Sequence, residues 1–282
     1  MKFSQPAAEL FVPDGIAEVQ ALERTTHLCL AAHQDDIEIM AAAPILDCFQ
    51  QPDRWFTGVV VTDGRGSPRD ALYRDTTDEE MRLVRFKEQK KAAVVGEFAA
   101  QILLDVPSKV IKDPARPEPV EDILSILQAT RPQFVFTHNL ADKHDTHVAV
   151  ALRVIAALRR LPDSQRPEKV YGCEVWRDLD WTLDADKVAF DTSAHENLQA
   201  ALLGVFDSQI AGGKRYDLAS MGRRRANATY YASHGTDATT GMNYAIDLTP
   251  LVADPQLDVQ AYVQAFVDRF AEDVRGRIGR LK

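Results

Sequence analysis

Short apolar runs alternate along the chain with longer stretches in which apolar residues recur at helical spacing. Continuous apolar runs of this length are typical of strands buried on both faces. They lie at residues 28–32, 55–62, 101–105, 133–137 and 169–176. Helical spacing is found between them at residues 37–49, 77–96, 120–129 and 148–161. Strands that alternate with helices predict right-handed crossovers and a mostly parallel sheet, and therefore an α/β fold.

The two ends of the chain have weaker patterns. Residues 1–14 contain two prolines and no sustained period, so we expect a surface arm, followed by a short helix at 16–22. After the fifth strand, the pattern predicts a helix at 195–209, a polar, loop-rich segment at 212–241, a strand at 244–248 and an amphipathic helix at 257–278 with a buried apolar face.

One helix has clear signals at both ends. Thr77 is a good N-cap, acidic residues occupy the first turn after it, and Gly96 is a typical stop. The loop at 106–119 contains prolines, and the acidic loop at 177–186 could wall a pocket or provide hydrophobic cover through its tryptophan.

Composition narrows the class of protein. At 282 residues, with 45% hydrophobic and 27% charged residues, the chain is typical of globular proteins. A net charge of −9 argues against nucleic acid as a partner, because phosphate backbones need clustered Lys and Arg and only Arg223–Arg225 forms a short basic run. No run approaches the roughly 20 apolar residues of a membrane span. Three scattered cysteines and the absence of a leader pattern predict a cytoplasmic protein with reduced thiols.

Candidate chemistry begins where the first strand ends. His33, Asp35 and Asp36 follow it directly, at a strand-to-helix turn. An imidazole and a carboxylate three residues apart can bind a divalent cation, while the second carboxylate takes a proton from a water molecule that the metal activates. The alternative is that the two aspartates only cap the following helix.

A second cluster follows the fourth strand, within ten residues: His138, Asp142, His144, Asp145 and His147. The carboxyl ends of parallel strands form the edge where α/β proteins bind ligands. Two strand ends that both deliver His and Asp therefore favour a shared metal site.

Taken together, these motifs make the sequence resemble the PIG-L/LmbE-like family of metal-dependent N-acetylglucosaminyl deacetylases. AHQDDIE at Ala32–Glu38 is similar to the family's AHPDDxE, and DKHDTH at Asp142–His147 is similar to DxHPDH. Between them, TDG at Thr62–Gly64 and the set Arg85, Glu88, Ala92, Ala93 and Gly96 match in order and spacing.

The resemblance implies a role for each matching residue. It implies that zinc is bound by His33, Asp36 and His147, that Asp35 is the general base, that His144 stabilises or protonates the intermediate, and that Arg85 faces the substrate. It also implies a Rossmann-like three-layer sandwich. We expect a single domain over 1–282, made of a surface arm at 1–14, a metal-site core at 15–165, and a C-terminal part at 166–282 that shapes the substrate pocket.

Two departures from the family pattern lie within the motifs. Gln34 replaces proline in the first, which alters the stiffness of the loop more than its chemistry, and Thr146 occupies the acidic position of the second. A carboxylate that orients His144 must therefore come from elsewhere, and Asp142 and Asp145 are the candidates.

The sequence thus favours a zinc-dependent hydrolase that removes acetyl from an N-acetylated amino sugar or its conjugate. A site with two histidines and an aspartate also suits iron(II), cobalt or nickel. One alternative is a non-catalytic, metal-containing protein of the same fold with a sugar-binding or regulatory role. Another is a nucleotide-binding or receiver-like module. The resemblance is compatible with a homo-oligomer.

Overall fold

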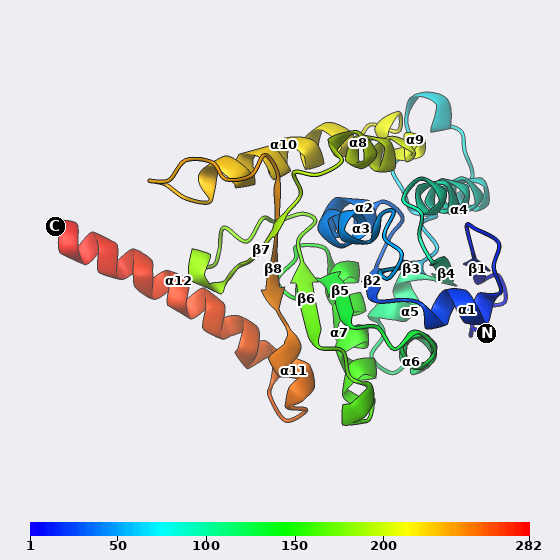
Figure 1. The fold of residues 1–282 in the computed structure, drawn as a ribbon, viewed down its shortest axis with the longest axis horizontal. Coiled ribbons are helices and arrows are strands. Elements are labelled where there is room, and N and C mark those ends of the chain that lie inside the picture. The colour runs from blue at the N-terminus through cyan, green and yellow to red at the C-terminus, as the bar shows by residue number, and fades with distance from the viewer.

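Eight strands form one sheet through the middle of the molecule in the order β1-β4-β3-β2-β5-β6-β8-β7, in a computed structural model that describes residues 1–282 (Figure 1). The strands are β1 (Glu9–Phe11), β2 (His27–Ala31), β3 (Phe56–Thr62), β4 (Ala100–Val106), β5 (Phe134–His138), β6 (Lys169–Cys173), β7 (Val188–Asp191) and β8 (Met242–Asp247). From β4 to β6 neighbouring strands are parallel, and β1, β7 and β8 pair antiparallel. The predicted mostly parallel α/β sheet is confirmed.

Helices cover both faces of this sheet. They are α1 (Glu18–Glu23), α2 (Asp36–Met40), α3 (Ala42–Cys48), α4 (Asp78–Val95), α5 (Ser108–Lys112), α6 (Glu118–Thr130), α7 (Asp145–Arg159), α8 (Glu196–Gly204), α9 (Asp207–Ile210), α10 (Tyr216–Tyr230), α11 (Thr249–Ala253) and α12 (Val259–Leu281), with short 3₁₀ turns at 71–73, 163–165 and 184–186. In Figure 1, α2, α3, α4 and α8–α10 lie on one side, and α1, α5, α6, α7 and α11 on the other. Each face has its own apolar core, as a three-layer sandwich requires.

The direction of winding reverses beside β2. From β2 the chain runs outward through β3 to β4, and then crosses back to β5 on the other side of β2. Because the connections at this point diverge to opposite sides, a crevice forms outside the carboxyl ends of β2 and β5. Both predicted motifs follow these two strands, so the topology brings them to one place.

Helix α4 confirms the expected boundaries. The hydroxyl of Thr77 accepts from the backbone N–H of Glu80, and the carboxylate of Glu80 accepts from the N–H of Thr77, which completes a capping box. Gly96 is the C-cap.

Three expectations for the N-terminal half were wrong. Residues 9–11 form an edge strand instead of lying in a surface arm, because they pair with Gln101–Leu103. The helix expected at 37–49 is broken into α2 and α3, because Pro44 has no N–H to donate to the carbonyl of Met40. The loop at 106–119 contains the helix α5.

The polar segment at 212–241 was also misinterpreted, since half of it is the 15-residue helix α10. This helix is anchored by buried polar side chains, which an apolar pattern cannot show. Arg224, 2% exposed, donates to the carbonyl oxygens of Glu38 (2.6 Å) and Ile39 (3.1 Å), and to Oε1 of Gln199 (2.9 Å). The carbonyl groups at the end of α2 therefore obtain a hydrogen-bond donor from a helix 186 positions later in the chain.

We expect Arg224→Ala to lower the free energy of unfolding by about 2–3 kcal/mol, because buried acceptors lose a charged donor. Denaturant unfolding measures this change. Arg225→Ala is the matched control, since Arg225 forms only an exposed pair with Glu196 and should leave the midpoint unchanged. Equal effects of the two substitutions would contradict the anchoring role of Arg224.

The C-terminal end of the long helix α12 projects away from the body of the molecule (Figure 1). We expected its apolar face to be buried, but only Phe266 is, and Val267, Val274 and Ile278 are exposed. Contacts with the body come early: the Tyr262 hydroxyl donates to the carbonyl of Asp247 at 2.5 Å. None of the helices has the length and apolar character needed to cross a bilayer.

Candidate functional site

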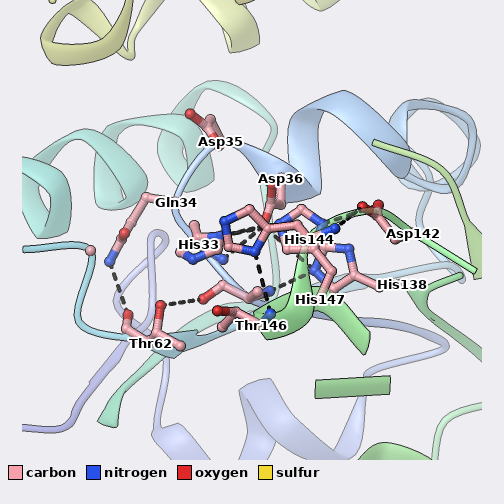
Figure 2. A network of polar contacts seen from close by, with 12 residues as sticks. His33, Gln34, Asp35, Asp36, Thr62, His138, Asp142, His144, Thr146 and His147 are labelled. Carbon is pink, nitrogen blue, oxygen red and sulfur yellow. Dashed lines mark hydrogen bonds and ion pairs between the residues drawn. The ribbon is translucent and has the colours of Figure 1, made fainter. Parts of the chain in front are cut away.

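The two sequence clusters meet at the carboxyl ends of β2 and β5 (Figure 2). His33 and Asp35 lie in the turn between β2 and α2, Asp36 is the first residue of α2, and His144 and His147 lie at the start of α7. A buried hydrogen bond joins the two strand ends, because the N–H of Ala32 donates to Nε2 of His138 at 2.7 Å. All residues with a predicted role in metal binding or catalysis lie in this region.

Three potential ligand atoms form a nearly equilateral triangle. Nδ1 of His33 lies 3.2 Å from Oδ2 of Asp36 and 3.2 Å from Nε2 of His147, and the last two atoms are 3.3 Å apart. Ligand atoms about 2.0–2.1 Å from a tetrahedral metal ion lie about 3.3 Å from one another. The residues present therefore fit a divalent metal, which His33, Asp36 and His147 would hold.

Other histidines nearby give two overlapping sets whose ligand atoms also lie within 4.8 Å of one another. One set is Asp36, His138 and His147, and the other is His33, His144 and His147. Nε2 of His138 is already occupied by the N–H of Ala32 and is 3.5 Å from Asp36, so His138 is a supporting group. We favour the triangle of His33, Asp36 and His147, because its three ligand atoms are 3.2–3.3 Å apart and no backbone N–H donates to its two imidazole nitrogens.

Asp142 holds the ring of His147. Its Oδ2 lies 3.2 Å from Nδ1 of His147, and its Oδ1 accepts from the N–H of His144 at 2.9 Å. Metal-binding histidines generally donate their second ring N–H to such a carboxylate, which fixes the tautomer that leaves the other nitrogen free. Burial lowers the pKa of His147, but Asp36 and Asp142 outweigh it, so the net pKa is raised.

Asp142→Ala is expected to weaken metal binding about 10- to 100-fold, the usual cost of losing such a partner. Competition with a chelator of known affinity measures the change. Asp145→Ala is the matched control, because Asp145 is exposed and makes no ion pair with either histidine. An unchanged affinity in Asp142→Ala would show that Asp142 does not orient His147.

The two adjacent aspartates have opposite electrostatic environments. Burial raises the pKa of Asp35 to about 7, although Arg85 opposes the shift. Burial also acts to raise the pKa of Asp36, but the neighbouring imidazoles, His147 foremost, outweigh it and hold that pKa well below its usual range. Paired carboxylates whose pKa values are pushed apart are typical of a division between a permanently charged group and a proton carrier.

Asp35 is held in place by strained backbone and by Arg85. Its φ of 86° is rare outside glycine, and its N–H donates to Oε1 of Gln89 at 3.3 Å. Arg85, 2% exposed, donates to Oδ2 of Asp35 (3.4 Å) and to the carbonyl oxygen of Gln34. Figure 2 shows the Asp35 carboxylate apart from the imidazole cluster, on the side of α4. The structure thus places Arg85 against Asp35, at the wall of the cavity.

His144 is oriented by backbone and not by a carboxylate. Its Nδ1 accepts from the N–H of Thr146 at 3.3 Å, so in the neutral ring the proton is on Nε2. Burial and the neighbouring His147 lower the pKa of His144, which favours this neutral form. Neither candidate carboxylate forms a hydrogen bond or ion pair with the ring, since Asp142 pairs with His147 instead.

Gln34, which replaces the family's proline, joins the first motif to the loop after β3. Its side-chain amide donates to the carbonyl of Thr62 at 3.3 Å. A Cβ at Gly64 would lie 2.2 Å from Oε1 of Gln34, and the φ of Gly64 is +69°. The TDG turn thus needs glycine for its backbone conformation and for its close approach to Gln34.

A cavity of about 480 Å³ opens above the triangle. The glycine-rich loop after β3 contributes to its rim, and Trp176, Tyr216 and Lys214 form another part of the wall. We expected residues 166–282 to shape the pocket, but not which of them: nothing in the spacing marks Trp176, which follows β6, or Tyr216 of α10. Glu88, which matches the family pattern between the two motifs, does not line the cavity. Its carboxylate accepts hydrogen bonds from the N–H (2.7 Å) and the hydroxyl (2.6 Å) of Ser208.

Comparison with known proteins supports this arrangement. Residues 28–158 match the family model described as "PIG-L: GlcNAc-PI de-N-acetylase". No sequence among the curated proteins matches significantly.

Solved structures share the fold at low identity. The N,N'-diacetylchitobiose deacetylase from Pyrococcus horikoshii superposes with a TM-score of 0.63 at 15% identity, covering 84% of this chain and 88% of that one. A conserved protein from Thermus thermophilus has a TM-score of 0.58 at 18% identity, with 83% and 99% covered. GalB, the 4-carboxy-2-hydroxymuconate hydratase from Pseudomonas putida, has a TM-score of 0.58 at 14% identity, with 79% and 95% covered. At these identities the likeness shows the fold alone, and this fold carries both a deacetylase and a hydratase.

Proposed function

Because residues 28–158 form a PIG-L domain, we propose that this protein is a metal-dependent hydrolase that removes an acetyl group from an N-acetylated amino sugar or its conjugate. The observation that carries the proposal is the triangle of His33, Asp36 and His147 beside a buried carboxylate that is not part of it. Three ligands with an open position are typical of catalytic metal sites, whereas structural sites are closed.

His33, Asp36 and His147 would hold the metal. A divalent ion bound there supplies Lewis acidity, which makes water a better nucleophile and polarises the amide carbonyl. Zinc suits two nitrogens and one carboxylate oxygen, and so does iron(II), so the ligand set does not select between them. We propose zinc, with iron(II) as the alternative.

Asp35 is proposed as the general base. Its carboxylate takes a proton from the water that attacks the amide carbonyl, and a pKa raised by burial suits such a group near neutral pH. The same proton passes to the amide nitrogen as the C–N bond breaks, so the products are acetic acid and a free amine, which ionise to acetate and an ammonium group. Arg85 keeps Asp35 in position through its guanidinium and lies at the substrate cavity.

His144 is proposed to stabilise the negative charge that develops on the carbonyl oxygen. With Nδ1 occupied by the N–H of Thr146, its Nε2–H is the free donor. A single donor aimed at developing charge typically contributes about 3–4 kcal/mol. Because this donor is oriented by backbone, Thr146 in the acidic position of the motif does not remove it.

The test is release of free amine from a panel of N-acetylated sugars, including N-acetylglucosamine and N,N'-diacetylchitobiose, with elemental analysis of the same protein. We expect bound metal near one per chain and release that stops with a chelator and returns with added metal. Metal without release would favour the non-catalytic alternative. Release that a chelator does not affect, from a protein free of metal, would contradict the proposal.

A further inference from the structure

A smaller pocket of about 130 Å³ lies beside the main cavity. The two share four wall residues, Ile39, Val175, Trp176 and Tyr216, so a molecule in the main cavity can extend into the smaller one. Counting about 30 Å³ per water molecule, the space corresponds to about four waters. That is enough for the hydroxyl-bearing edge of a sugar, but not for a large substituent.

The pocket is lined by acceptors that have no partner. Glu174, which follows β6, is 5% exposed, and neither carboxylate oxygen has a hydrogen-bond donor. Oδ1 of Asn243 on β8 is also buried without a partner. Buried polar groups are nearly always hydrogen-bonded, so unpaired acceptors in one pocket point to a ligand that donates.

Charges around the pocket favour a neutral donor. The Nζ atoms of Lys143 and Lys214 lie 5.1 and 5.5 Å from the ring centre of Trp176, and Arg223 is part of the pocket wall. These cations disfavour entry of an ammonium group, whereas hydroxyl groups carry no charge. Burial, together with the nearby carboxylates of Asp142 and Asp178, raises the pKa of Glu174 to about 8, which suits a group whose ligand is neutral. The aromatic rings of Trp176 and Tyr216 offer an apolar wall against which a sugar ring can pack.

We propose that this pocket is a subsite in which hydroxyl groups of the substrate donate to Glu174 and Asn243. The proposal rests on the proposed function, because it takes the substrate to be a sugar. It adds that Glu174 decides which hydroxyl pattern is accepted.

The experiment compares the wild-type protein with Glu174→Leu and Glu174→Gln. Binding of glucosamine, N-acetylglucosamine and their single-deoxy analogues to chelator-treated protein is measured by calorimetry, and kcat and KM are measured with metal restored. Glu168→Gln, on an exposed residue at the opposite end of β6, is the control. Melting temperatures are recorded for all variants.

We expect one deoxy analogue to bind the wild type at least tenfold more weakly than its parent, and this difference to disappear in Glu174→Leu. The Leu variant should also melt at a higher temperature, because it removes an unpaired buried carboxyl group. A gain in stability with a loss of hydroxyl discrimination distinguishes a binding role from a structural one. Glu174→Gln, which keeps one acceptor, should lie between the two and covers the case in which the Leu variant fails to fold.

Two results would overturn the subsite. If Glu174→Leu and Glu174→Gln discriminate the analogues as the wild type does, the subsite is wrong, while acetyl release leaves the proposed function standing. If no sugar binds and none is hydrolysed, both proposals are wrong.

Discussion

Asp35→Asn is expected to lower turnover about 10²- to 10⁴-fold while the metal content stays unchanged, since general base catalysis contributes this much. An amide cannot take the proton that the carboxylate takes. Asp35 is not part of the triangle, so the ligand set remains intact. Initial rates of amine release, together with elemental analysis, measure the two effects separately.

The choice of asparagine follows from the backbone. At a φ of 86°, Asn is tolerated better than most residues, so the substitution removes the acid without adding strain. Arg85 can still donate to the amide oxygen. An Asp35→Asn protein that turns over at the wild-type rate would contradict the general-base assignment, whatever its metal content.

His147→Ala is expected to lose the bound metal, and turnover with it. Its Nε2 is one corner of the triangle, so the variant keeps two ligands, and Asp142 loses the ring it orients. Elemental analysis after dialysis measures the loss.

His234→Ala is the matched control for this substitution, because His234 is exposed in the loop before β8. It should keep its metal and its activity. Full metal content in His147→Ala would remove that residue from the ligand set and favour the alternatives His138 and His144.

The sequence predicted those parts of the fold that rest on local signals. The five central strands are continuous apolar runs, and α4 has both of its caps, so pattern and structure agree there. Helix α10 was missed because Arg224 and other polar side chains anchor it. The edge strand β1 was missed because three residues with no special composition become a strand only through pairing with β4.

For the site, it was enough to know that the carboxyl ends of parallel strands lie at one edge of the sheet. This predicted that the two clusters meet. The finer arrangement was not predictable, because it depends on the register between β2 and β5. That register brings Ala32 to His138 and so occupies one imidazole. The orientation of His144 by the N–H of Thr146 likewise depends on the cap geometry of α7. The remaining walls of the main cavity and of the smaller pocket come from β8, α10 and the residues after β6, and these segments carry no motif.

The projecting second half of helix α12 should unfold locally while the rest of the molecule stays folded. Phe266 and Tyr262 tie its first half to the body, whereas the exposed second half contains Gly276 and Gly279. Each glycine costs about 1 kcal/mol relative to alanine in a helix, and an isolated helix of a few turns is marginal in water. Its final turns should therefore unwind and rewind independently of the rest. Amide hydrogens after about residue 270 should exchange with deuterium far faster than those before it. The free energy of the local opening that exposes them should be well below the free energy of global unfolding.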